Sequence, residues 1–318
     1  MFKFRILLTA IVIALSTATI AQPTNFNTNR SWQMNAKDIY FGVGASQFLG
    51  DLGGRDKIGA NYSLADIDFA ATGFSALVGY RWRFHKYFAT TFNLNFAMLR
   101  GDDKLTGNPF RHTRKLNFRS WTVSYDQRLE FILWSREEVG HRHRVPGLRG
   151  YKVHNERFYL FTGIGITYFH TQGKLNGSWH SLREMNTEGQ GLPGGAKKYL
   201  PITAQIPFGI GFRWGIGPSW TMGLEVSYVK TFSDYIDDVS TNYYDNDAIA
   251  AANGSLAAQL ADPNDGPNPN WTQGGEVRGD PKQKDAYFMI NVTFAKNLSY
   301  KNLGKSRFKR WKVVKAKF

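Results

Sequence analysis

The sequence predicts an all-β fold, an eight-stranded antiparallel transmembrane β-barrel with long extracellular loops. Three observations lead to this prediction. Apolar and polar residues alternate along eight segments, the connections between the segments alternate between long and short, and aromatic residues gather at one end of the segments. The chain has 318 residues, which is long enough for eight membrane-crossing strands and sizeable loops.

The alternation is clearest between residues 74 and 99. Every second side chain is mostly apolar over 74–84 and again over 90–98, and the side chains between them are small, polar or cationic. Because successive side chains of a strand point to opposite faces, two strands joined by a tight turn are predicted. A soluble sandwich would bury the apolar face, whereas a membrane barrel turns it toward lipid. The barrel interpretation places Tyr80 and Trp82 in lipid, and Arg81 and Arg83 in the lumen.

Six further segments complete the predicted barrel. Arg157–His170 is apolar on both faces, so its lumen side stays unassigned. Pro207 lies inside another segment and, because it has no N–H for a ladder bond, predicts a β-bulge there. The six segments are Lys37–Phe48, Leu116–Leu133, Arg157–His170, Pro201–Gly215, Trp220–Phe232 and Ala286–Phe294.

The connections and the aromatic residues favour the barrel over the sandwich. The turns at His85–Tyr87 and Ile216–Ser219 are short, Ser135–Glu156 is intermediate, and the others are long. Outer-membrane barrels have short periplasmic turns and long external loops, so the N- and C-termini are predicted in the periplasm. Aromatic rings favour the lipid headgroup level. The predicted periplasmic girdle consists of Trp82, Phe84, Phe88, Trp134, Trp214, Trp220 and Phe294.

The N-terminus is typical of a secretory signal peptide. Lys3 and Arg5 precede an apolar stretch, and Thr19 and Ala21 suit cleavage before Gln22. The expected organisation is a signal peptide over 1–21, a periplasmic segment over 22–36, the barrel over 37–296 and a basic periplasmic tail over 297–318. The chain has no cysteine, which excludes disulfides, thiol catalysis and cysteine-ligated metal sites.

Two sets of charged residues are candidate functional residues. The first set faces the lumen in the predicted register, and we expect its charges to pair and plug the barrel because unpaired buried charges are costly. Its members are Arg81, Arg83, Asp126, Arg128, Glu130, Arg213 and Glu225.

The second set forms a basic periplasmic face that we expect to bind a partner. The tail is either a solvated, disordered chain or a basic amphipathic helix whose aromatic stripe docks on membrane or on an acidic protein. The predicted binding residues are Arg142, Arg144, Arg149, Lys152, Lys309, Arg310, Trp311, Lys312 and Lys315.

The acidic clusters and the histidines do not predict a metal site or a catalytic site. Asp102–Asp103, Asp234 with Asp237–Asp238, and Asp245 with Asp247 could bind calcium but match no calcium-loop spacing, so solvated loop ends or turn-capping carboxylates are the favoured interpretation. No histidine is placed on a lipid-facing strand beside a serine of matching height, so no enzymatic activity is expected. We also expect no cofactor, metal, nucleic acid or small-molecule substrate. The alanine-rich stretch 245–262 predicts a helix interrupted near Asn253–Gly254.

Several stretches together resemble one family, the PorG-like outer-membrane barrels of the type IX secretion system. They are "GVGASQFLGDLGG" (42–54), "GYRWRFHKYFATTFNLNFAMLRGDDK" (79–104), "RKLNFRSWTVSYDQRLEF" (114–131), "TEGQG" (187–191), "IPFGIGFRW" (206–214) and "TFSDYIDDVSTNYY" (231–244). The resemblance implies a non-enzymatic role in protein secretion and gliding motility, in which the barrel anchors a periplasmic ring of the lipoprotein PorK and its partner PorN. The alternative is a generic eight-stranded barrel of the OmpA or OmpW kind, acting as structural anchor, adhesin or narrow solute channel.

Overall fold

The computed structural model describes residues 31–52, 71–105, 108–138, 154–217, 219–264 and 268–299. The predicted signal peptide, and the predicted basic tail apart from residues 297–299, lie outside these ranges. The first described element is a short 3-10 helix, η1 (Ser31–Asn35), which leads into the first strand.

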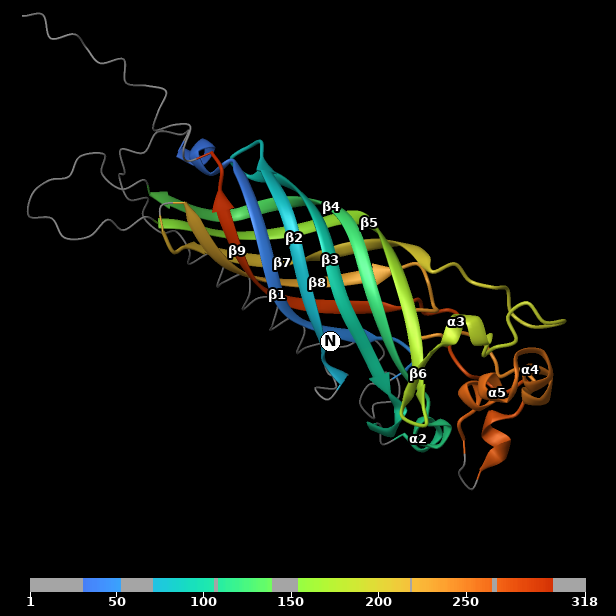
Figure 1. Cartoon of the computed structure of the whole chain (residues 1–318). Helices are drawn as coiled ribbons and strands as arrows, with labels where there is room; N and C mark the ends of the chain where they lie inside the picture. The colour runs from blue at the N-terminus through green and yellow to red at the C-terminus, as the bar shows by residue number, and fades with distance from the viewer. Residues whose placement is uncertain are drawn as a thin grey trace, which may run out of the picture.

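Eight long antiparallel strands close into the predicted barrel (Figure 1). Each strand pairs with its neighbours in sequence, and β1 pairs with β9 to close the ring. A ninth strand, β6 (Ser178–Ser181), pairs only with the C-terminal end of β5 and so lies outside the barrel. The barrel strands are β1 (Lys37–Leu49), β2 (Gly73–Arg83), β3 (Phe88–Asp102), β4 (Asn117–Glu138), β5 (His154–Leu175), β7 (Ile202–Gly215), β8 (Trp220–Thr231) and β9 (Ala286–Asn297).

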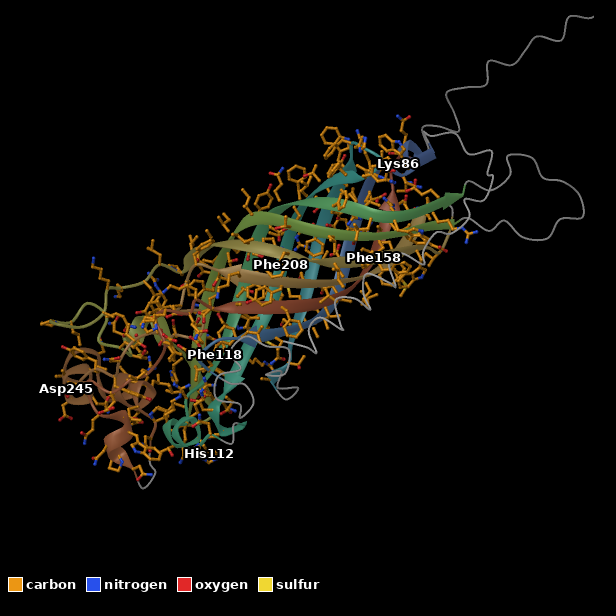
Figure 2. All side chains as sticks on the ribbon, turned by 180° about the vertical axis from the view of Figure 1, so that it is seen from behind. Lys86, His112, Phe118, Phe158, Phe208 and Asp245 are labelled. Carbon is orange, nitrogen blue, oxygen red and sulfur yellow. The ribbon has the colours of Figure 1, made fainter. Side chains whose placement is uncertain are left out.

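Side chains sort between the two faces of the barrel as the alternation predicts. Trp82 is 47% exposed on the outside, whereas its neighbour Arg81 is 1% exposed inside. The strand that the sequence left unassigned, β5, turns Tyr159 and Phe161 inward and Ile164 outward. Exposed apolar side chains from all eight barrel strands form an apolar belt on the outer face, which suits lipid rather than water. Figure 2 shows carbon-rich side chains projecting from the barrel wall on the side that faces the viewer.

The aromatic girdle predicted at the strand ends is present. Trp82 and Phe84 are in edge contact with ring centroids 6.1 Å apart, and Phe84 stacks on Phe88 at 6.4 Å. Trp134 and Trp220 are also exposed on the outer face. Such a ring of aromatic side chains marks the headgroup level at this end of the barrel.

The prediction of a bulge at Pro207 is wrong. The β7–β8 register is unbroken there, with Pro207 opposite Val229. On the other side, the β5–β7 register also continues, but the paired residues skip from Thr162 to Gly165. Pro207 therefore costs ladder bonds to β5 without adding a residue to the strand. The register shift that does occur lies between Ile132 and Trp134 of β4.

The connections after β4 and β5 begin later than the sequence predicts. β4 and β5 have 22 residues each and project beyond the belt at both ends. The predicted loop over Thr171–Leu200 therefore includes the end of β5, the β5–β6 hairpin and the helix α3 (Leu182–Met185). Within the described ranges no helix is long and apolar enough to cross a membrane.

The loops at the end opposite η1 pack into a cap that we call the dome (Figure 1). The interrupted helix predicted over 245–262 is present as α4 and α5, which are separated by Gly254 at a positive φ of +88°, a backbone conformation that favours glycine. The dome also contains β6 and α3. Its remaining elements are η4 (Asp103–Leu105), α2 (Pro109–Arg114), α4 (Asn246–Asn253), α5 (Ser255–Ala261) and η5 (Pro269–Thr272).

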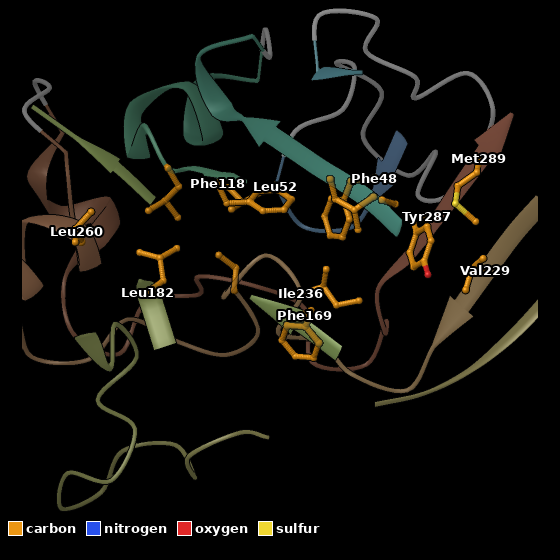
Figure 3. Packing of buried hydrophobic residues seen from close by; sticks show 14 residues of the cluster. Phe48, Leu52, Phe118, Phe169, Leu182, Val229, Ile236, Leu260, Tyr287 and Met289 are labelled. Carbon is orange, nitrogen blue, oxygen red and sulfur yellow. The ribbon is translucent and has the colours of Figure 1, made fainter. Parts of the chain in front are cut away.

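A hydrophobic core joins the dome to the barrel mouth (Figure 3). Phe48 and Phe118 reach it from β1 and β4 with ring centroids 4.8 Å apart, while Ile236 and Leu260 enter it from the dome. Burial of these apolar side chains holds the loops over the lumen. The mouth of the barrel beneath the dome is therefore closed by packed side chains.

Candidate functional site

All seven side chains predicted to face the lumen are buried inside the barrel. Their relative exposures range from 1% to 3%, and each comes from an inward position of its strand. β2 supplies two of them, β4 three, β7 one and β8 one. They are Arg81, Arg83, Asp126, Arg128, Glu130, Arg213 and Glu225.

Arg81 and Glu130 form the central ion pair. The Nε of Arg81 donates to both carboxylate oxygens of Glu130, at 2.8 and 2.7 Å. Nitrogens of the same guanidinium lie 3.8 Å from Asp38 and 3.6 Å from Glu225. One arginine of β2 thus links carboxylates of β1, β4 and β8 across the lumen.

A second pair lies farther toward the dome. Arg128 donates to Asp126 at 2.6 Å, and the same carboxylate accepts from Asn93 at 2.8 Å and from Asn95 at 2.5 Å. Arg128 also lies 3.8 Å from Glu225, which connects the two pairs. Several charge-assisted hydrogen bonds on one carboxylate offset much of the cost of burying it.

The sequence prediction missed three charged members of this network, Asp38, Glu137 and Arg157. Asp38 lies 3.4 Å from Arg213 and 3.6 Å from Arg157, and its place in the β1 alternation was available as a signal. Arg157 begins the segment whose faces were left unassigned. Glu137 lies beyond the predicted end of its strand, and the register shift after Ile132 turns it toward Arg83 and Arg157.

Two buried tyrosines line the same network. The Tyr159 hydroxyl donates to Glu225 at 2.6 Å, and the Tyr40 hydroxyl bonds Asn93. The Arg81 guanidinium lies 4.7 Å from the Tyr40 ring centroid and 5.3 Å from that of Tyr159. Arg213 lies at 4.9 Å from the Tyr40 ring. Cation–π contacts therefore supplement the ion pairs.

The charges of the network balance and its side chains fill the lower lumen. Among the described barrel residues, the inward arginines are matched one for one by carboxylates. A barrel of about eight strands has an interior that side chains just fill. The arginines are Arg81, Arg83, Arg128, Arg157 and Arg213, and the carboxylates are Asp38, Asp126, Glu130, Glu137 and Glu225.

A second set of ion pairs holds the dome. Arg278 donates to Glu188 at 3.1 Å, to the Asp238 carbonyl at 2.8 Å and to Thr187 at 3.2 Å. Arg114 pairs with Asp103 and donates to the carbonyls of Arg278 and Asp51, at 2.6 and 2.7 Å. These two arginines connect loops that are far apart in sequence.

Asp237 and Asp245 cap turns, as predicted, but the acidic clusters are not solvated loop ends throughout. Asp103 is buried in an ion pair with Arg114, and the buried Asp238 accepts from the Tyr199 hydroxyl at 2.5 Å. Asp237 accepts from the backbone N–H groups of Leu52 and Val239, at 3.1 and 3.0 Å. Asp245 caps α4 by accepting from the N–H of Asp247 at 3.1 Å. Within the residues that the structure places, no group of three or more His, Asp or Glu side chains is arranged to hold a metal ion.

Burial gives two of these carboxyls an unusual titration. It raises the pKa of Asp234 to about 6, against a smaller lowering by the hydrogen bond from Ser240. It also raises the pKa of Asp238 to about 6, although the nearby Arg278 charge opposes the shift. Asp237 and Asp285 have pKa values raised well above the ordinary range by burial, with a further contribution from neighbouring carboxylates.

The predicted basic periplasmic face falls on parts of the chain outside the described residues. These are Arg142, Arg144, Arg149 and Lys152 in the connection between β4 and β5, and Lys309, Arg310, Trp311, Lys312 and Lys315 in the tail. The partner-binding role assigned to them stays a prediction.

Comparisons with known proteins give structural neighbours only. No protein-family model and no curated protein matches the chain. Neisserial surface protein A is similar at a TM-score of 0.35 and 6% identity, over 82% of this chain and 96% of that one. OprG from Pseudomonas aeruginosa is similar at a TM-score of 0.35 and 11% identity, over 82% of this chain and 96% of that one. Ail of Yersinia pestis, solved with the heparin analogue sucrose octasulfate, has a TM-score of 0.33 and 8% identity over 82% and 97%.

Proposed function

We propose that the protein is a closed, non-conducting barrel that anchors other components at the outer membrane. The observation that supports this proposal is the double closure of the lumen. Paired charges around Arg81 and Glu130 fill its lower part, and the core of the dome covers the other end. Beneath the dome, the cavity lined by Leu52, Leu182 and Asp237 has a volume of only about 20 Å³, room for about one water molecule.

A planar-bilayer recording tests the closure. We expect the purified barrel to show no porin-like conductance, since its lumen charges are neutralised by one another and its mouth is packed. Steady open currents in symmetric salt would contradict the proposal and favour the narrow solute channel among the alternatives. A barrel of the porin class reconstituted in the same bilayers is the positive control.

The arrangement of the strand ends supports termini that face the periplasm. The chain enters and leaves the barrel at one end, where the Leu298 N–H donates to the Lys37 carbonyl at 2.8 Å. The short turn after β7 lies at this end, because the Asn297 N–H donates to the Ser219 carbonyl at 2.8 Å. Since barrels of this class keep short turns in the periplasm, the dome would face outward.

A finer proposal adds the partner. The resemblance to PorG-like barrels favours anchoring of the periplasmic PorK and PorN ring of the type IX secretion machinery, and the basic residues of the β4–β5 connection and the tail supply charge for docking on an acidic surface. A closed barrel suits this role, because an anchor needs no pore. The generic barrel, as anchor or adhesin, needs no ring at all.

Co-purification in mild detergent distinguishes the two roles. We expect ring components to be recovered with the wild-type barrel. Recovery should fall after deletion of 305–318 combined with Arg142→Ala, Arg144→Ala and Arg149→Ala, and fall further at high salt, where the remaining attraction is screened. Equal recovery with this variant would exclude the basic face as the docking surface. If the wild type recovers no ring component, the generic barrel is favoured.

A further inference from the structure

A cluster of cations stands on the outer face of the barrel immediately above the apolar belt on the dome side. On β3 the outward residues run Leu94, Phe96 and Met98, and Arg100 follows. On the neighbouring strand β4, Trp121 ends the belt and Arg119 follows it. The rings of Phe96 and Trp121 lie 5.5 Å apart, which marks the headgroup level at this edge.

Two of these cations face each other across the strand pair. Arg100 and Arg119 are direct register partners of β3 and β4. Side chains in such positions have Cβ atoms about 5 Å apart, and like charges placed there destabilise a sheet. The pairing therefore makes no contribution to folding that would explain it.

Neither arginine has an acidic partner within the described ranges. A terminal nitrogen of Arg100 contacts the Met98 sulfur at 3.4 Å, and a thioether is a weak acceptor. The nearest acid on this face in sequence is Asp102, whose carboxylate accepts the backbone N–H of Lys104 at 2.9 Å. The Arg100 guanidinium thus keeps its charge and most of its donors for another group.

Arg119 is held in a fixed position with its terminal donors free of hydrogen bonds to the residues described. Its Nε donates to Gln172 at 2.8 Å, and its guanidinium lies 4.2 Å from the Trp179 ring centroid and 5.8 Å from that of Trp121. Trp179 reaches this place because β6 pairs with the projecting end of β5 (Figure 1). A preorganised guanidinium binds a tetrahedral oxyanion at little entropic cost.

Lys174 adds a third cation. It lies opposite Trp179 in the β5–β6 hairpin, and its ammonium is 6.0 Å from that ring. Asn117 fixes the lysine backbone by accepting from its N–H at 2.7 Å and donating to its carbonyl at 3.2 Å. Arg100, Arg119 and Lys174 together form what we call the outer cation patch.

We propose that the outer cation patch binds the phosphate groups of a phosphorylated glycolipid in the outer leaflet of the membrane. Its position at the edge of the belt places it beside lipid headgroups, and its arginines match phosphate by charge and by their forked donors. The acyl chains of the lipid would lie on the belt below, along Phe96 and Met98. The proposal depends on the orientation proposed above, in which the dome faces outward.

Native mass spectrometry of the whole purified barrel tests the proposal with lipid A carrying two phosphates as the probe. We expect the wild type to retain lipid A and the triple variant Arg100→Gln, Arg119→Gln and Lys174→Gln to bind it about a hundredfold more weakly, from the usual contribution of each headgroup-facing cation. A matched control removes three exposed dome charges, Lys197→Gln, Lys198→Gln and Lys282→Gln, and should bind as the wild type does.

Three comparisons identify the ligand. The wild-type barrel should not retain dephosphorylated lipid A in native mass spectrometry. Phosphatidylglycerol should bind to it less tightly than lipid A does. Millimolar inorganic phosphate should not displace bound lipid A. Equal retention of lipid A by the triple variant, or of dephosphorylated lipid A by the wild type, would overturn the proposal. Equal binding of phosphatidylglycerol would overturn the assignment to a glycolipid, and displacement by phosphate would reveal a site for the free anion.

The heat-dependent gel mobility of barrels shows whether each variant is folded. If the triple variant does not fold, Arg100→Gln alone gives the same test with a smaller loss, because the described contacts of Arg100 are limited to Met98. Orientation is measured separately by cysteine labelling, described below, so a barrel with the opposite orientation is distinguishable from one without a lipid site.

Discussion

Arg81 shows how much of the lumen depends on one side chain. Its guanidinium bonds Glu130 and lies within 4 Å of Asp38 and Glu225, so it neutralises carboxylates from three strands. The sequence predicts its inward orientation from the alternation alone. Its partners follow from the closure of the barrel, which brings β1, β4 and β8 around it.

Replacement of Arg81 with methionine should destabilise the barrel by roughly 3–5 kcal/mol, because it leaves the buried carboxylate of Glu130 without its counter-ion. The double variant Arg81→Met with Glu130→Met should recover part of this loss. Urea unfolding in detergent, followed by heat-dependent gel mobility, measures both effects. The control Lys37→Ala changes an exposed side chain and should stay within about 0.5 kcal/mol of wild type. An Arg81→Met barrel as stable as wild type would show that the ion pairs do not hold the lumen.

The raised pKa values of Asp234 and Asp238 predict that the dome is more stable in mild acid than at neutral pH. Burial raises the pKa of both carboxyls to about 6 in the folded chain, above the ordinary aspartate value of about 4. A raised pKa means that the folded state holds a proton that the unfolded state has released, so stability falls as the pH rises from about 4 to about 6. The carboxyls of Asp51, Asp237 and Asp285 shift in the same direction.

Amide hydrogen exchange over 232–285 should therefore be slower at pH 5 than at pH 7.5, after correction for the intrinsic pH dependence of exchange. Asp234→Asn and Asp238→Asn should each reduce this difference, since an amide does not titrate. Asp102→Asn, on an exposed strand end, is the control and should leave the difference unchanged. Faster opening of the dome at pH 5 would contradict the assignment.

Among the elements, the dome depends on long-range contacts more than on its own helices. α4 and α5 have eight and seven residues, too few for stable helices in isolation. Leu260 and Ile236 join the core at the barrel mouth, and Arg278 ties the loop to Glu188. The dome should therefore open as a unit when one of these connections is broken.

Arg278→Met should expose the dome to protease while the barrel stays folded. The change leaves Glu188 buried without its cation, and the strands do not depend on this contact. Limited proteolysis of purified protein should cut within 232–285 at least tenfold faster than in the wild type, which corresponds to a loss of about 1.4 kcal/mol. Lys197→Met, at an exposed position of the dome, is the matched control. Unchanged cleavage would show that apolar packing alone closes the mouth.

At the scale of the whole molecule, the long loops lie at one end of the barrel and the short turns at the other, so the two ends can be labelled separately to measure the orientation in the membrane. The chain has no cysteine, so single cysteines report position without background. Ala252 is exposed on α4 in the dome, and Lys86 is exposed in the tight turn at the opposite end. Figure 2 shows Lys86 at the end of the barrel away from Asp245, the residue that caps α4.

A membrane-impermeant maleimide should label Ala252→Cys in intact cells, and Lys86→Cys only after the outer membrane is permeabilised. This result follows from an outward-facing dome and periplasmic short turns. Labelling of Lys86→Cys alone in intact cells would reverse the orientation. It would also place the outer cation patch at the inner leaflet.

The alternation of side chains determined most of the barrel in advance. Strand faces, the lipid-facing position of Trp82 and the inward position of Arg81 follow from the two-residue period of a strand and the requirement that lipid meet apolar groups. The helix pair over 245–262 followed from alanine content and Gly254. These features depend only on residues close together in the sequence, so a short stretch of sequence is enough to predict them.

Tertiary structure decided which groups meet. The register shift after Ile132 turned Glu137 into the lumen, and barrel closure brought Asp38 beside Arg157 and Arg213. At Pro207 the sheet keeps its register with both neighbouring strands and only lacks the β5–β7 pairs between Thr162 and Gly165. The pairing of Arg100 with Arg119 depended on the register between β3 and β4. The position of Trp179 beside Arg119 depended on the β5–β6 hairpin. Contacts between residues distant in sequence depend on register and closure, and both are properties of the assembled sheet rather than of any one strand.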